Sequence, residues 1–202
     1  MKTLEEFMAY GESLAGLGAT PLHDIAVQKQ TANILFPWDP PEVRLQLTQT
    51  SSNCMLAILA DLRHAEVDDP DLHVSHGIYS PGSLRAVGFR NPAALLVNVA
   101  QRAGALLDIK STQRNPKRGD VFIVGHGLQT HGLLVRSYNP IDGTLESVDG
   151  GQGARGAGIE YRTRRLGWDD ASQKFWLYTG PNLDQRDRDV THWIDVERIL
   201  SA

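Results

Sequence analysis

The spacing of apolar residues predicts three helices in the first half of the chain. Residues 4–14 alternate as an amphipathic helix does, and the glycines that follow end it. Four consecutive residues at 50–53 can each cap a helix, and they come directly before an apolar run from Cys54 to Ala60. Asn91-Pro92 begins a third helix, which Gly104 ends. The second helix is apolar nearly all round, so we expect it to be buried at the centre of the fold.

The pattern changes from helical to strand spacing after residue 104. Short β-branched and aromatic runs are separated by Gly, Pro, Asn or Asp, which is typical of an antiparallel meander. A turn at 139–143 predicts a hairpin between its two neighbouring runs. The charged residues 182–189 predict a loop, and apolar residues between 193 and 200 predict a short final helix. The predicted strands are 105–109, 120–124, 132–136, 144–148, 159–164 and 175–179.

Helices first and strands later predict an α+β fold. With 202 residues, the chain has enough apolar material for one sizeable core. We therefore expect a single domain over 1–202, with an N-terminal helical extension at about 1–45 and an inserted loop segment at about 66–90.

Charge and composition argue against several classes of function. The net charge is −4 and neither sign forms a long block, so nucleic acid is a poor candidate partner. No apolar run reaches the roughly 20 residues that span a bilayer. The acidic N-terminal segment lacks the pattern of a signal peptide, so we expect a soluble chain made in the cytoplasm. The single cysteine, Cys54, excludes an intrachain disulfide and a multi-cysteine metal site.

Cys54 is the candidate nucleophile. A thiol in the first turn of a helix is helped to ionise by unpaired backbone N–H groups and by the helix dipole. A cysteine enzyme also needs an imidazole and a polar group that orients it. His131 begins one predicted strand of the hairpin and Asp149 ends the other, so the turn between them makes the two residues neighbours. The sequence therefore predicts a triad of Cys54, His131 and Asp149.

Each of these residues has a plainer interpretation. Cys54 could be a small apolar residue of the core. His126, at the far end of the preceding strand, competes with His131 for the role of base. Asp149 could be a turn residue ahead of two glycines. For the arginines of the next strand, a solvated strand face is the favoured interpretation, and it covers Arg162, Arg164 and Arg165.

Four short motifs follow one another within roughly residues 46–180. They are Ser52-Asn53-Cys54-Met55, Asn115-Pro116-Lys117-Arg118-Gly119-Asp120-Val121, His131-Gly132-Leu133-Leu134-Val135 and Val148-Asp149-Gly150-Gly151. This series resembles the papain-like amidase and endopeptidase superfamily, specifically its NlpC-type and CHAP branches. The resemblance implies a papain-like fold in which a buried, nucleophile-bearing helix packs on an antiparallel sheet. It also implies that Cys54 is the nucleophile, His131 the general base and then acid, and Asp149 the orienting residue.

The resemblance also bears on the oxyanion hole. The backbone N–H of Cys54 can supply one donor. Gln49 is the candidate for the second, because papain-like enzymes often place a glutamine shortly before the cysteine, and Gln46 and Asn53 compete with it. Met55 after the cysteine departs from the family pattern, which usually has a small residue and Gly, or an aromatic residue, there.

We therefore expect a cysteine hydrolase, a thiol protease or amidase that cuts an amide bond through a thioester. The resemblance implies peptidoglycan peptide as substrate. The chain is also similar to antibacterial toxins exported as effectors by a dedicated secretion system, or to a phage lysis enzyme. For an effector toxin, we expect an immunity protein as partner. The alternatives are a papain-like deamidase or transglutaminase acting on a host protein, and a noncatalytic binding domain. We expect no cofactor, and the pair His73 and His76 lacks the context of a metal site.

Overall fold

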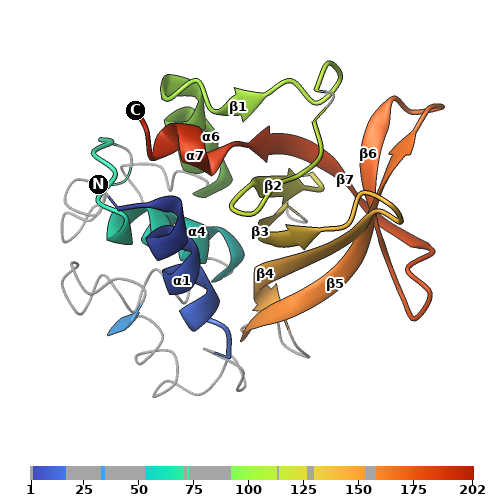
Figure 1. Ribbon diagram of the computed structural model, residues 1–202, viewed down its shortest axis with the longest axis horizontal. Coiled ribbons are helices and arrows are strands. Elements are labelled where there is room, and N and C mark those ends of the chain that lie inside the picture. Colours follow the sequence, from blue (N-terminus) through green and yellow to red (C-terminus); the bar gives the residue numbers. More distant parts are fainter. Residues whose placement is uncertain are drawn as a thin grey trace, which may run out of the picture.

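The central feature of the computed structural model is a closed barrel of six antiparallel strands (Figure 1). The structure describes residues 2–16, 33–34, 53–70, 72, 92–112, 114–126, 130–152 and 158–202. Neighbouring strands follow the order β7-β2-β3-β4-β5-β6, and β6 pairs again with β7, which closes the ring. A short strand, β1 (Leu106–Leu107), adds to the end of β7. The six barrel strands are β2 (Val121–Val124), β3 (His131–Tyr138), β4 (Thr144–Gln152), β5 (Gly158–Asp169), β6 (Lys174–Thr179) and β7 (Gln185–Ile194).

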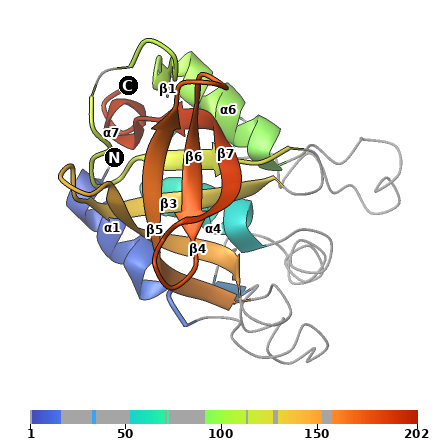
Figure 2. The ribbon, with the colours of Figure 1, turned by 90° about the vertical axis from the view of Figure 1, so that its right-hand side faces the viewer.

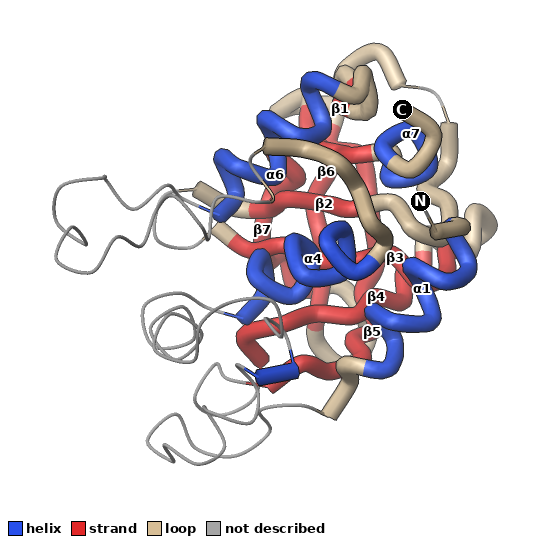
Figure 3. The backbone as a smooth tube through the Cα atoms, turned by 90° about the vertical axis from the view of Figure 1, so that its left-hand side faces the viewer, coloured by secondary structure: helices blue, strands red, loops and turns tan. Residues whose placement is uncertain are grey.

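The labelled helices gather on one side of the barrel, as Figures 1 and 3 show. They are α1 (Leu4–Ser13), α4 (Asn53–His64), α6 (Pro92–Arg102) and α7 (Val196–Ile199). A capping box between Thr3 and Glu6 begins α1, and Gly104, with a φ of 63°, follows α6. The three longer helices lie where the sequence predicts them, because their start and stop signals are local.

The predicted fold class, α+β and papain-like with the nucleophile-bearing helix packed on an antiparallel sheet, is wrong. The structure is mainly a closed six-stranded barrel with few helices around it. The difference arises at β7, because residues 182–189 were expected to form a loop, whereas 185–189 form the first half of the closing strand. β7 pairs with both β6 and β2. The predicted open meander is therefore closed into a barrel, because its first and last strands are joined through β7.

Two apolar clusters share the strands of the barrel. An inner cluster takes residues from all six strands, so it fills the barrel; it includes Phe122, Leu133, Leu145 and Trp193. An outer cluster joins outward side chains of β2, β3, β4, β5 and β7 to the helices. Its largest fully buried members include Phe7, Met8, Leu62, Leu96 and Leu134. Because side chains alternate along a strand, β2 is buried on both faces.

The Gly119-Asp120 step of the second motif forms a corner where the chain enters the barrel. Gly119 adopts a φ of 90°, which favours glycine. The Asp120 carboxylate is fully buried and accepts hydrogen bonds of 2.8 Å from Arg114 and from the Trp193 indole. This motif therefore has a structural role, since it ties the start of β2 to the end of β7.

Candidate active site

Cys54 is the second residue of α4, as the capping residues before it predict. The helix packs on β3 and β4, and its residues from Ala57 to Leu62 are buried. Figures 2 and 3 show that α4 and α6 begin on the same side of the molecule, the side on which β2 and β4 end. The start of α4, the helix that carries Cys54, therefore lies on the side of the molecule where β3 begins.

His131 and Asp149 form a buried pair. Their side chains are joined by a contact of 2.9 Å between His131 Nε2 and Asp149 Oδ2, and they are 8% and 0% exposed. The hairpin between β3 and β4 brings them together, as its turn sequence predicts, with Leu133 directly opposite Asp149. Asp149 does not end its strand, because β4 continues to Gln152 and Asp149 pairs on its other side with Glu160. The interpretation of Asp149 as a turn residue is therefore wrong.

Two further side chains bind the Asp149 carboxylate. Ser147 donates to Oδ1 at 2.5 Å, and a guanidinium nitrogen of Arg164 lies 2.6 Å from Oδ2. Another nitrogen of Arg164 donates to the Ser147 hydroxyl at 2.9 Å. Burial raises the pKa of Asp149, but the hydrogen bond from His131 and the positive charge of Arg164, helped by Ser147, bring that pKa below its ordinary value. Asp149 is thus a carboxylate whose charge is retained inside the barrel.

The sequence pattern does not predict a role for Ser147, and for Arg164 it favours a solvated strand face. Arg164 is instead buried, with 7% of its side chain exposed. The spacing of two residues between Leu145, Ser147 and Asp149 was a signal for Ser147, because all three point to one side of β4. Arg164 could not be placed in this way, since the direction of its side chain depends on closure of the barrel.

The pair points into the end of the barrel. Leu145 belongs to the inner cluster and shares its side of β4 with Asp149, whereas Val148 belongs to the outer cluster that α4 covers. The sequence resemblance implies a pair on the sheet face covered by the helix. In the structure His131 shares its side of β3 with Leu133 of the inner cluster, and α4 packs on the outside of the same two strands.

His126 has an acidic partner of its own. Its Nε2 lies 3.0 Å from Asp189 Oδ2, but 70% of its side chain is exposed. Lys174 binds the same oxygen of Asp189 at 2.6 Å. Burial raises the pKa of Asp189, and the bonds from Lys174 and His126 outweigh it and lower that pKa overall. His126 thus shares its carboxylate with a lysine at the surface, whereas His131 and its carboxylate are shielded from water.

A cavity of about 350 Å³ flanks the start of β3. Its walls are the first two turns of α6, the end of β2 and a part of β7, and Thr130 lines it next to His131 in the chain. Small side chains, Ala93 and Ala94, form the helical wall, and Asn98 adds a polar group. His126 also lines this cavity, whereas His131 and Asp149 do not, so the space lies near the start of β3 and not against the buried pair.

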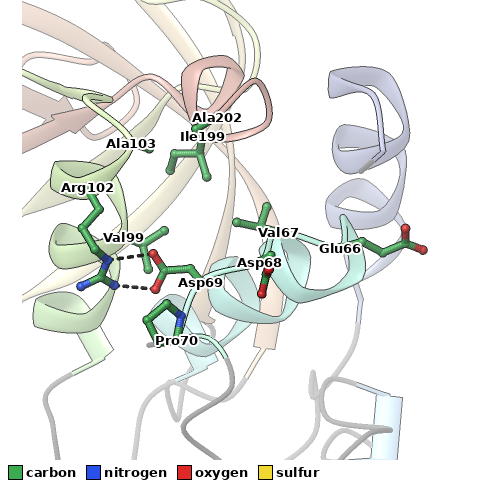
Figure 4. A pocket seen from close by; sticks show the side chains of 10 residues that line it. All are labelled: Glu66, Val67, Asp68, Asp69, Pro70, Val99, Arg102, Ala103, Ile199 and Ala202. Carbon is green, nitrogen blue, oxygen red and sulfur yellow. Dashed lines mark hydrogen bonds and ion pairs between the residues drawn. The ribbon is translucent and has the colours of Figure 1, made fainter.

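A second cavity, of about 570 Å³, lies away from the pair, between α6, α7 and the chain that follows α4. Arg102 and Asp69 both line this cavity, and their side chains point toward each other (Figure 4). Arg102 Nε donates to Asp69 Oδ2 at 2.9 Å. A second guanidinium nitrogen reaches Oδ1 at 2.5 Å. This two-point ion pair fastens the segment after α4 to α6, which is a structural role.

Several predicted residues lie outside the described part of the chain. They include the oxyanion candidates Gln49 and Gln46 and the histidines His73 and His76; Asn53 begins α4. Among the residues that the structure describes, no group of three or more His, Cys, Asp or Glu side chains could hold a metal ion. Within the same residues, no helix is both long and apolar enough to cross a bilayer.

Comparison with known proteins adds no relative. A scan against protein-family models finds no match, and searches of curated proteins and of solved structures find no similar chain.

Proposed function

We propose that the protein is a cysteine amidase or endopeptidase in which Cys54, His131 and Asp149 cut an amide bond. The observation that carries this proposal is the buried hydrogen bond between His131 and Asp149, at the end of the barrel where α4 begins. A neutral imidazole that donates from Nε2 to a carboxylate keeps Nδ1 as its basic nitrogen. Nδ1 is then the atom that exchanges a proton with the thiol.

The chemistry follows the order of a covalent hydrolase. His131 takes the proton of Cys54, the thiolate attacks the amide carbonyl, and a thioester forms as the imidazolium gives its proton to the leaving amine. His131 then takes a proton from water, which attacks the thioester and releases the acid and the thiol. Asp149 stabilises the imidazolium in both steps without accepting its proton.

For the substrate we propose a peptide of bacterial peptidoglycan, which rests on the motif resemblance. The cavity that flanks the start of β3, with its small helical wall and its polar groups, has room for a side chain of such a peptide. An immunity protein that covers this end of the barrel is the corresponding proposed partner, and export by a dedicated secretion system is the proposed route.

Alkylation of the native protein tests the proposed thiol directly, because Cys54 is the single cysteine of the chain. A thiolate paired with an imidazolium ionises below the free thiol pKa of about 8.5, so we expect rapid reaction with iodoacetamide at neutral pH. His131→Ala removes the positive partner and should move the alkylation profile to higher pH. Equal profiles for wild type and His131→Ala would contradict the proposal.

The matched control is His126→Ala, because His126 also has an aspartate partner among the residues that the structure describes. Its alkylation profile should match that of wild type, and the reverse result would assign the base to His126. Incubation with defined muropeptides, read by mass spectrometry, then tests the substrate. Cys54→Ser and His131→Ala should each abolish cleavage, since residues that act as one unit lose activity together. Transfer or deamidation products would assign the protein to the transglutaminase or deamidase alternative in place of hydrolysis. Cleavage by Cys54→Ser would contradict the proposal.

A further inference from the structure

We infer that Arg164 is a positioning residue, which fixes the charge and direction of Asp149 and through it the orientation of His131. The kinetic part of this inference rests on the proposed function, whereas the effect on Asp149 does not. The contacts that carry it run from β5 to β4, where Arg164 reaches both Ser147 and Asp149.

Arg164 supplies the permanent positive charge of this network. A carboxylate with no exposed surface is costly in its ionised form unless a charged partner compensates it. His131 is charged only when protonated, so it cannot compensate Asp149 throughout a reaction in which it gains and loses a proton. A guanidinium stays charged at every pH of interest. Arg164 therefore maintains the charge of Asp149 in the steps in which His131 is neutral.

The geometry uses two arms of the guanidinium. One nitrogen lies 2.6 Å from Asp149 Oδ2, the oxygen that also meets His131, and another donates to Ser147, which in turn holds Oδ1. Both carboxylate oxygens are thereby fixed, so the carboxylate plane cannot rotate away from the imidazole. A lysine provides a point charge without this planar fork, and so it can hold Oδ2 but cannot brace Ser147 with the same geometry.

Stability does not explain Arg164. The Nε atom of Arg164 is buried without a hydrogen-bond partner among the described residues. Burying a guanidinium costs desolvation that a single ion pair often does not repay, and an apolar pair of similar volume is frequently as stable. Arg165, the next residue, shows the ordinary alternative, because it stacks on Tyr178 at 4.1 Å and donates to a backbone carbonyl. The buried arginine is therefore better explained by what it does to Asp149.

The test follows the Asp149 carboxyl carbon by ¹³C NMR in the full chain, with its signal assigned by its loss in Asp149→Asn. Arg164→Gln should move the titration of Asp149 to higher pH, because burial remains and the compensating charge is gone. Arg165→Gln, which removes the same charge from the neighbouring residue, should leave the titration in place. Arg164→Lys should give an intermediate position. An unchanged titration in folded Arg164→Gln would overturn the inference. If Arg164→Gln does not fold, the titration of Asp149 is measured in Arg164→Lys and Ser147→Ala. An unchanged Asp149 titration in both variants would then overturn the inference.

Kinetics separate positioning from mere structure. Arg164→Gln should lower kcat by about 10- to 100-fold with little change in KM, as is typical for outer partners of a functional histidine. Arg164→Gln should lower kcat little further in the Asp149→Asn background, because the carboxylate through which Arg164 acts is already absent. Equal losses in both backgrounds would show a purely structural role. Should the wild type cleave no amide substrate, the proposed function fails while the carboxyl titration still decides the effect of Arg164 on Asp149.

Discussion

Two buried aspartates show how partners decide the state of a carboxyl group. Asp149 and Asp61 are both almost fully buried, at 0% and 2% exposure. Asp149 has three side-chain partners, and its pKa is lowered. Asp61, on α4, has an Oδ1 without a hydrogen-bond partner in the described part of the chain, and burial raises its pKa well above the ordinary value. The pKa values of the two carboxyl groups are therefore shifted in opposite directions, that of Asp149 towards the anion and that of Asp61 towards the neutral acid.

The raised pKa of Asp61 predicts a pH-dependent cost. A carboxyl whose pKa is higher in the folded state binds a proton more tightly there, so its contribution to stability is complete below the unfolded pKa of about 3.9 and is lost as pH rises towards the folded value. Asp61→Asn keeps the shape and cannot ionise. We expect it to raise the free energy of unfolding at pH 7 by about 1 to 3 kcal/mol, and to have little effect at pH 3.

Urea unfolding across this pH range measures the difference between the two proteins. The lowered pKa of Asp149 has the opposite effect on stability. Its stabilising contribution is present above the unfolded pKa and is lost as pH falls through the folded pKa. A pH-independent difference between wild type and Asp61→Asn would contradict a raised pKa of Asp61.

The elements differ in how far the sequence predicts them. Helices α1, α4 and α6 were predicted with their approximate ends, because caps, proline and glycine act within a few residues. The strands from β2 to β6 were predicted as a meander for a similar reason, since each pairs with its neighbour in the chain. β7 was not predicted because the residues at its start are charged and exposed, a pattern typical of a loop. They form a strand because they pair with β6 in a hairpin.

The candidate site also contains contacts that the local sequence predicts and contacts that depend on closure of the barrel. The approach of His131 to Asp149 follows from one hairpin and was predicted from its turn. The roles of Cys54, His131 and Asp149 remain predictions. The burial of Arg164 depends on which face of β5 turns inward, and closure of the barrel decides that face, so no local pattern reveals it.

The contact between α1 and α4 makes a prediction at the scale of the elements. Gly11 of α1 lies against Asp61 and Leu134, and a Cβ at this position would come within 2.8 Å of an atom of each. Gly to Ala normally stabilises the interior of a helix by about 0.5 to 1 kcal/mol. Here overpacking should reverse the sign, so we expect Gly11→Ala to destabilise the protein by about 1 to 3 kcal/mol. Thermal unfolding measures the sign, and a stabilised Gly11→Ala would show that α1 is free to move away from α4.

At the scale of the whole molecule, the barrel and the helices share their strands. Phe122 of β2 faces the inner cluster, while its neighbours Val121 and Ile123 face the helices in the outer cluster. Loss of order in one cluster therefore removes support from the other. We expect the barrel and the helices to unfold in one cooperative transition.

Trp193 provides the test of this coupling. Its ring meets Phe122 edge-on at a centroid distance of 5.0 Å inside the barrel, and its indole N–H donates to Asp120 at 2.8 Å. Trp193→Ala leaves a cavity and removes a donor from a buried carboxylate, so we expect a loss of about 3 to 5 kcal/mol in the free energy of unfolding. The matched control is Trp176→Ala on β6, whose half-buried ring stacks beneath Arg186 at 3.6 Å and should lose only about 1 kcal/mol.

Hydrogen exchange read by mass spectrometry distinguishes a shared transition from two separate ones. If the clusters are coupled through β2, Trp193→Ala accelerates exchange in the peptides of α4 as much as in those of β6, although Trp193 belongs to the inner cluster and not to the outer cluster that includes α4. Trp176→Ala should leave the exchange of α4 close to that of wild type. Faster exchange confined to the barrel strands in Trp193→Ala would show that the helices hold their structure independently of the barrel.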